Sequence, residues 1–62
     1  MNNLRYLRNN TGLSQLQFAQ LINVSQQAVT KWETGEALPR ADKLPEIAKI
    51  LHCSIEDLFK EV

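Results

Sequence analysis

The chain has 62 residues, of which 44% are hydrophobic and 23% are charged, and its formal net charge is zero. A domain of this size buries only about 60% of the surface that its unfolded chain exposes, which leaves no room for a deep catalytic cleft. The hydrophobic content predicts a folded chain, and no apolar run approaches the roughly 18 residues that a membrane span needs. The N-terminus lacks the charged start and the apolar stretch of a secretion signal, so we expect no membrane partner.

The cysteine and histidine content argues against a metal site and against an enzyme. Cys53 is the only cysteine and His52 the only histidine, so neither an internal disulfide nor a protein-only zinc site can form. Sequence neighbours are poorly placed to act as a base and a nucleophile, and no glycine-rich loop is present to hold phosphate. We therefore expect no cofactor and no enzymatic activity, and a buried apolar role for Cys53 in a reducing cytoplasm.

Charge is distributed unevenly along the chain. Residues 1–32 contain three basic residues and no acidic residue, which gives this stretch a charge of +3. Residues 33–40 carry −1 and residues 41–62 carry −2. One end of the molecule can thus approach a polyanion while the other stays solvated, although such a split also arises by chance in small domains.

Hydrophobic periodicity predicts helices throughout, and both prolines and both glycines fall where helices should begin or end. The first helix is expected over residues 2–9, where Leu4, Leu7 and Arg8 share one face. Gly12 follows closely and suits a left-handed stop.

The second helix is expected to begin at Ser14, which forms a capping box with Gln17. Leu13 and Phe18 are spaced as a hydrophobic staple at the same end. The helix ends at Asn23, a residue type that tolerates a left-handed backbone. The residues expected to be buried are Phe18, Ala19, Leu21 and Ile22.

The third helix is expected to begin at Ser25 and to end at Gly35. Val24 is spaced to pack on Val29 as a second staple. Val29 and Trp32 should face inward. Trp32 could instead stack on a nucleobase, but its spacing favours the core.

Two further helices are expected in the C-terminal half. The fourth lies within residues 42–51, with Asp42 as its cap and Pro45 in its first turn, where the missing N–H removes no internal bond. The fifth begins at Ser54, with Asp57 at the capping-box position. Apolar residues repeat at i, i+3, i+4 and i+7 in both, as Leu44, Ile47, Ala48 and Leu51 in one and Ile55, Leu58, Phe59 and Val62 in the other.

The second and third helices are joined by only three residues, 22–24. So short a joint makes two helices cross steeply, which is the helix-turn-helix arrangement. The positions that then face inward are all apolar: Phe18, Ala19, Ile22, Val24, Val29 and Trp32.

The outward face of the third helix has neither an acidic nor a large apolar residue: it comprises Ser25, Gln26, Gln27, Ala28, Thr30 and Lys31. Glutamine can pair with the major-groove edge of adenine, and lysine can donate to guanine or to phosphate. Threonine can donate, accept, or offer its methyl group to thymine. Taken alone, the Gln26–Gln27 pair would be interpreted as a solvated surface, and the surrounding motif is what favours base contact.

Three stretches carry a resemblance to a known family: QLQFAQLINVSQQAVTKWETG at residues 15–35, the preceding LRYLRNNTGLSQ, and the later LPEIAKILHCSIEDLF. Together they resemble the Cro and phage-repressor family, the XRE-type regulators. The resemblance implies an all-α fold, a compact five-helix lambda-repressor-like domain over residues 1–62 with the helix-turn-helix formed by helices 2 and 3.

The sequence departs from the family pattern at two joints. Asn23 stands where the family often has glycine, and asparagine can adopt that backbone. His52 and Cys53 replace the usual glycine and valine, so we expect His52 to be strained or the fourth helix to end differently.

The resemblance also implies roles for particular residues. Gln15 would bind a phosphate, and Arg40 would contact the backbone or the neighbouring minor groove. Arg8 and Glu33 would form an ion pair that ties the first helix to the third. The residues implied to contact DNA are Gln15, Ser25, Gln26, Gln27, Thr30, Lys31 and Arg40.

The function implied is that of a sequence-specific regulator of transcription, a repressor that binds double-stranded DNA as a homodimer without a small-molecule ligand. Two-fold symmetry predicts a near-palindromic operator with half-sites roughly 34 Å apart. The candidate dimer residues are Leu38, Ile55, Phe59 and Val62, although Ile55 and Phe59 could belong to the core. Such a protein would be bacterial or phage-encoded, cytoplasmic and associated with the nucleoid.

A second interpretation remains open. The same fold can serve as an antitoxin or anti-repressor, a protein-interaction module whose main partner is another protein held on the last helix.

Overall fold

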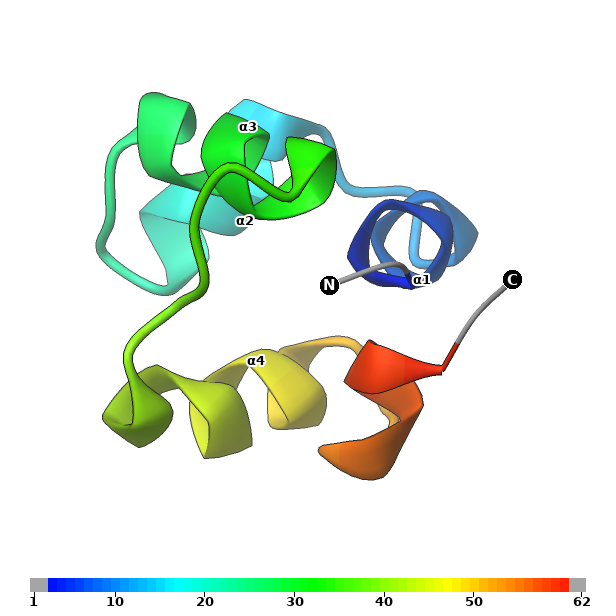
Figure 1. The fold of residues 1–62 in the computed structure, drawn as a ribbon. Coiled ribbons are helices and arrows are strands. Elements are labelled where there is room, and N and C mark those ends of the chain that lie inside the picture. The colour runs from blue at the N-terminus through cyan, green and yellow to red at the C-terminus, as the bar shows by residue number, and fades with distance from the viewer. Residues whose placement is uncertain (1–2, 61–62) are drawn as a thin grey trace.

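Four short α-helices and two 3-10 turns account for the regular structure of residues 3–60, which are the residues that the computed structural model describes (Figure 1). Within this range there is no strand, which confirms the prediction of an all-α fold. None of these helices is long and apolar enough to cross a membrane. In chain order the elements are α1 (Leu4–Asn10), α2 (Gln15–Leu21), α3 (Gln26–Thr34), the 3-10 turn η1 (Ala41–Lys43), α4 (Leu44–Ile50) and the 3-10 turn η2 (Glu56–Phe59).

Helices α2 and α3 begin at the predicted caps, Ser14 and Ser25. The Ser14 hydroxyl accepts from the Gln17 backbone N–H at 3.0 Å, and the Ser14 N–H donates to the Gln17 side chain at 2.9 Å. This reciprocal pair is the capping box that the sequence predicts. The Ser25 hydroxyl likewise accepts from the backbone N–H of Ala28 at 3.1 Å. Both starts therefore satisfy backbone donors that have no partner within their helix.

All four α-helices of residues 3–60 end in the same way, with a left-handed residue shortly after the last helical residue. Each α-helix is followed by a residue with a positive φ, as the values show: Gly12 78°, Asn23 59°, Gly35 84° and His52 56°. After α2 the Val24 N–H donates back to the Ala19 carbonyl at 3.0 Å, and after α4 the Cys53 N–H donates to the Ala48 carbonyl at 3.0 Å. Each of these bonds satisfies one carbonyl in the last turn of its helix, at the point where the chain turns toward the next element.

One contiguous core lies between the two halves of the fold. In Figure 1, α2 and α3 lie together at one end, α1 lies beside them, and α4 and η2 lie at the other end. Trp32 is 5% exposed, so its predicted core position is confirmed. The buried apolar residues are Leu4, Phe18, Ala19, Ile22, Val29, Trp32, Ile47, Ala48, Leu51 and Leu58.

The prediction that Leu21 is buried is wrong. Its side chain is 56% exposed, whereas Phe18 and Ile22 are fully buried. Leu21 lies one helical turn after Gln17 on the exposed side of α2, and both line an open hollow with Gln20 and with Leu13 from the preceding loop.

The expected cap of the fourth helix is also wrong. Asp42 lies inside η1, and its carboxylate is 3.6 Å from the Arg40 guanidinium instead of bonding the start of α4. The 3-10 turn runs directly into α4, so the N-cap position falls on Lys43, which makes no side-chain capping bond. Pro45 does lie in the first turn of α4, as its missing N–H predicts.

The fifth helix is present only as the four-residue 3-10 turn η2, so the five-helix count is not confirmed. Ser54 and Asp57 do form the predicted reciprocal box, with both bonds at 3.1 Å. Only Leu58 in this turn is fully buried, while Ile55 is 40% and Phe59 is 47% exposed. Lys60 is extended and ends the turn, and Val62 lies outside the described residues.

Two groups in and just before this turn, Asp57 and Cys53, have shifted pKa values. Hydrogen bonds from Lys60 and from Ser54 hold the pKa of Asp57 below its ordinary value. Burial raises the pKa of the Cys53 thiol, and the negative charge of Asp57 adds to the effect. Cys53 packs against the core cluster, and a thiol with a raised pKa stays protonated and unreactive at neutral pH.

Replacing His52 with glycine should stabilise the fold. A left-handed backbone is unfavourable for a residue with a Cβ, so we expect His52→Gly to raise the free energy of unfolding by about 0.5–1 kcal/mol. Thermal unfolding followed by circular dichroism should show the midpoint rise by about 2–8 °C. Asn23→Gly is the matched control and should gain less, because asparagine tolerates this backbone; a lower midpoint for His52→Gly would contradict the account.

Candidate nucleic-acid interface

The joint between α2 and α3 sets the geometry of the site. Ile22 closes α2, Asn23 turns the chain with a φ of 59°, and Val24 packs against the core. The Lys43 ammonium donates to the Ile22 carbonyl at 3.0 Å, which fixes the same joint from the C-terminal half. Together with the short length of the joint, these contacts hold α3 across α2 in the helix-turn-helix arrangement (Figure 1).

The outward side of α3 is a polar ridge, defined as Gln26, Gln27, Thr30 and Lys31. All four residues are exposed, and their helix has no acidic residue in its first turn. Val29 is fully buried and Trp32 is 5% exposed, so the opposite side of the helix is anchored in the core. The four predicted base-contacting residues therefore lie on one surface of one helix.

Ser25 and Ala28, which neighbour the polar ridge in sequence, have structural roles in α3. The Ser25 side chain is exposed but caps α3, so its hydroxyl oxygen already accepts one hydrogen bond. Ala28, which the sequence places on the outward face, is half-buried and packs against the core cluster. It lies three residues after Ser25 and one before Val29, at the edge where α3 meets the rest of the fold.

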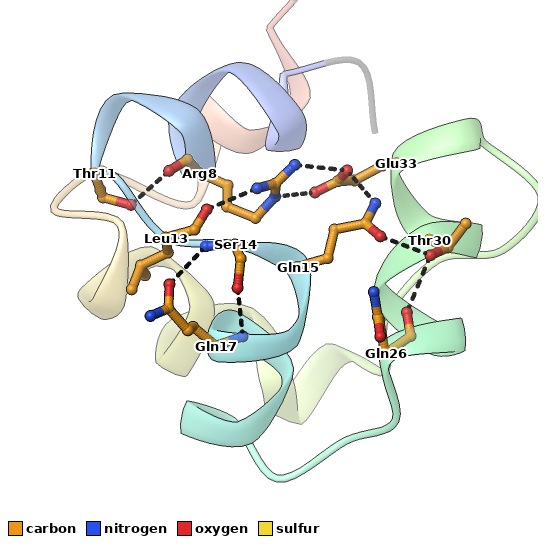
Figure 2. Close-up of polar contacts among 9 residues, drawn as sticks. All are labelled: Arg8, Thr11, Leu13, Ser14, Gln15, Gln17, Gln26, Thr30 and Glu33. Atoms are coloured by element: carbon orange, nitrogen blue, oxygen red, sulfur yellow. Dashed lines mark hydrogen bonds and ion pairs between the residues drawn. The ribbon is translucent and has the colours of Figure 1, made fainter.

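A buried ion pair ties the first helix to the third. The Arg8 Nε is 2.6 Å from Glu33 Oε2, and the side chains of Arg8 and Glu33 are only 9% and 3% exposed. Arg8 Nη2 also donates to Glu33 Oε1 at 3.3 Å, and Nη1 donates to the Leu13 carbonyl at 2.7 Å (Figure 2). The guanidinium thus joins α1, the loop before α2, and α3.

Gln15 extends this network to the polar ridge. Its Nε2 donates to Glu33 Oε1 at 2.8 Å, and its Oε1 accepts from the Thr30 hydroxyl at 3.0 Å (Figure 2). The Thr30 hydroxyl also lies 3.2 Å from the Gln26 carbonyl. Gln15 is half-buried at the first residue of α2, so a side chain expected to bind phosphate also contacts two residues of α3.

The Gln15 contacts with Glu33 and Thr30 were not predicted from the sequence. Residues 15 and 33 lie 18 positions apart, and neither stands at a cap or in an apolar repeat. The sequence offers one signal, which is that Glu33 is the first acidic residue of the chain; this indicates a structural partner for Glu33 but does not identify Gln15.

The remaining candidate residues lie away from the polar ridge in sequence. The Arg40 side chain is 87% exposed beside Asp42, so it is available to a partner. Leu38 is 66% exposed, and Ile55 and Phe59 are exposed on η2 or beside it. The fourth candidate dimer residue, Val62, lies outside the described part of the chain.

Comparison with known proteins relates this sequence to regulators of transcription. A family model described as "Helix-turn-helix" matches residues 4–58. The chain is 36% identical over 56 residues to the HTH-type transcriptional activator BcrR of Enterococcus faecalis, a match that covers 90% of this chain and 28% of that protein. It is 33% identical over 51 residues to the HTH-type transcriptional regulator DicA of Escherichia coli, covering 82% of this chain and 38% of that protein. The chain thus spans less than two-fifths of the length of either curated relative.

Separating Arg8 from Glu33 should destabilise the fold strongly. Arg8→Met leaves a buried carboxylate unpaired and Glu33→Leu leaves a buried guanidinium unpaired, so each should lower the free energy of unfolding by about 3–5 kcal/mol. The double variant removes both charges and should be more stable than either single variant. Urea unfolding at low temperature measures the free energy of unfolding of all three variants. If each single variant lay within about 0.5 kcal/mol of the parent, the pair would contribute no more than an exposed surface ion pair, which would contradict the prediction.

Proposed function

Because this chain belongs to the XRE-type helix-turn-helix family of DNA-binding transcriptional regulators, we propose that it binds double-stranded DNA sequence-specifically through the polar ridge of α3. The observation that carries the proposal is the exposure of Gln26, Gln27, Thr30 and Lys31 on one side of a helix whose other side is buried. A major groove about 12 Å wide admits such a helix.

The chemistry of the ridge fits base edges. Gln26 and Gln27 can each donate to and accept from adenine, and Lys31 can donate to guanine or to phosphate. These residues lie in the first two turns of α3, and the N-terminal residues of a recognition helix are the ones that contact bases. An acidic residue there would repel the phosphates; the one acid in the helix, Glu33, is turned into the network behind the ridge.

Contacts outside α3 would fix the position of the protein on the duplex. An amide nitrogen carries two hydrogens, so Gln15 can donate one to Glu33 and the other to a phosphate. The exposed Arg40 follows the loop after α3 and would reach the backbone or the adjacent minor groove. Ser25 would contribute through its hydroxyl hydrogen, since its oxygen already caps α3. Such phosphate contacts set register and orientation but carry little sequence information.

A homodimer on a near-palindromic operator completes the proposal. One recognition helix reads only a few base pairs, and a chain with zero net charge gains modest phosphate attraction. Two copies related by two-fold symmetry would double the contacts, with half-sites roughly 34 Å apart. The exposed Leu38, Ile55 and Phe59 supply apolar surface for the contact between copies. Occupation of a promoter by such a dimer would block polymerase, so we propose repression.

The same exposed apolar side chains support the second candidate, a protein-interaction module. Here Leu38, Ile55 and Phe59 would bind a different protein, and the polar ridge would be a solvated surface. The two functions differ in what the isolated chain does with DNA.

Selection of bound sites from random duplexes tests the proposal. The purified chain should enrich a short sequence, present as two inverted copies about one helical turn apart. Enrichment of no sequence, together with a stoichiometric protein partner recovered on the purified chain, would favour the interaction module. A single half-site without symmetry would retain DNA binding and reject the dimer.

Gln27 should contribute to base selection. Gln27→Ala removes one bidentate contact, so binding to the selected duplex should weaken by about 1–3 kcal/mol and preference at one base position should relax. Gln20→Ala is the matched control, since Gln20 is exposed on the side of α2 that lines the open hollow. Repeating the site selection with both variants gives the answer, and an unchanged preference for Gln27→Ala would remove this residue from the interface.

Lys31 should contribute through charge. Lys31→Gln is expected to weaken binding to selected and unselected duplexes alike, and to reduce the slope of log K against log salt by about 1 because one fewer counterion is released. Lys49→Gln, on the exposed surface of α4, should leave the slope unaltered. Fluorescence anisotropy titrations over a range of salt concentrations measure both; a loss confined to one sequence with an unaltered slope would place Lys31 on a guanine.

The dimer should depend on the apolar surface near η2. Phe59→Glu places a charge on this surface, so it should weaken self-association and binding to the full operator while leaving half-site binding intact. Tyr6→Glu provides the control, because Tyr6 is an exposed aromatic residue on α1. Sedimentation over a concentration series measures association, and a parent chain that remains monomeric at high micromolar concentration would contradict the dimer.

A further inference from the structure

The amide of Gln15 has only one orientation that satisfies its neighbours. The Glu33 carboxylate faces the Arg8 guanidinium at 2.6 Å, and an ionised carboxylate only accepts hydrogen bonds. Gln15 therefore turns its NH₂ group to Glu33 at 2.8 Å, which leaves its oxygen 3.0 Å from the Thr30 hydroxyl (Figure 2). The opposite orientation would place the amide oxygen against a carboxylate that is only 3% exposed, where two acceptors repel each other without solvent between them.

With the amide in this orientation, Gln15 offers the Thr30 hydroxyl an acceptor. A hydroxyl has one hydrogen to donate and two lone pairs to accept. Both nearby protein atoms, Gln15 Oε1 at 3.0 Å and the Gln26 carbonyl at 3.2 Å, are acceptors. The single hydrogen is thus directed into the protein, and the exposed Thr30 presents to its surroundings a lone pair and a methyl group.

We infer that Thr30 contacts DNA as a hydrogen-bond acceptor and through its methyl group, and not as a donor. Gln15, held by Glu33, is the positioning residue that supplies the nearer of the two acceptors for the Thr30 hydrogen. The inference rests on the proposed function and specifies one part of it. Guanine offers only the acceptors N7 and O6 in the major groove, whereas adenine and cytosine offer amino groups and thymine offers a methyl group. If guanine were the base that faces Thr30, its acceptors N7 and O6 would lie against the lone pair of the Thr30 hydroxyl oxygen. Because two acceptors repel each other, we expect guanine to be disfavoured at this position.

Site selection with three variants tests the inference. Thr30→Val keeps the shape and the methyl group but loses the lone pair, so the base position at which its preference changes is the one that Thr30 faces. At this position the parent chain should disfavour guanine by about fivefold, the value of one net hydrogen bond. Gln15→Met keeps the Arg8–Glu33 pair but removes the nearer acceptor of the Thr30 hydrogen, which leaves only the Gln26 carbonyl at 3.2 Å. The hydrogen is then held by one bond in place of two, so the discrimination against guanine should fall to about twofold.

Base preference separates positioning from support of the fold. Loss of a phosphate contact in Gln15→Met would weaken all sequences alike, and loss of stability would lower the unfolding midpoint, but neither changes the preference at one base. Gln20→Met makes the same substitution on the outer side of α2 and should change neither affinity nor preference.

The outcomes are distinct. Failure of the parent chain to enrich any sequence would overturn the proposed function and this inference together. Enrichment by the parent chain with the same base preferences in Gln15→Met would overturn the inference alone. Guanine enriched opposite Thr30, or no position at which Thr30→Val changes preference, would overturn it as well, since Thr30 would then donate to a base or contact none.

Discussion

The buried Arg8–Glu33 ion pair is the constraint on which the geometry of the site depends. It joins α1 to α3 across the loop that precedes α2, with both side chains almost fully removed from solvent. Burying charges is unfavourable unless each is paired and bonded, and here the carboxylate also accepts from Gln15 while the guanidinium donates to the Leu13 carbonyl. Every member of the network thus requires the others, so α3 is held at one angle and its polar ridge is presented as a unit (Figure 2).

Local chemistry explains why much of the fold can be predicted from the sequence. The boxes at Ser14 and Ser54 depend on residues three positions apart, and the left-handed joint at Asn23 depends on the residue itself. The buried side of α3 follows from the spacing of Val29 and Trp32. These features are short-range, so one sequence suffices to predict them.

The predictions from sequence are wrong or incomplete where tertiary packing, and not local sequence, decides which side chains are buried or in contact. Leu21 satisfies the periodicity of a buried stripe, yet the core beneath α2 is already filled by Phe18 and Ile22. Ile55 and Phe59 repeat like helix residues, but η2 ends at an extended Lys60 and buries only Leu58. The Gln15 contacts also belong to this class, because only the folded chain brings two glutamine atoms to a carboxylate and a hydroxyl 15 to 18 residues away.

The five glutamines of the chain allow the central claim to be measured directly. Gln15, Gln26 and Gln27 belong to the proposed interface, whereas Gln17 and Gln20 line the open hollow on α2. Their side-chain NH₂ resonances can be followed by two-dimensional NMR while a selected duplex is added. If the polar ridge and Gln15 contact DNA, the NH₂ resonances of Gln15, Gln26 and Gln27 should shift strongly and those of Gln17 and Gln20 should change little. Shifts concentrated on Gln17 and Gln20, with the ridge glutamines unaffected, would contradict this claim.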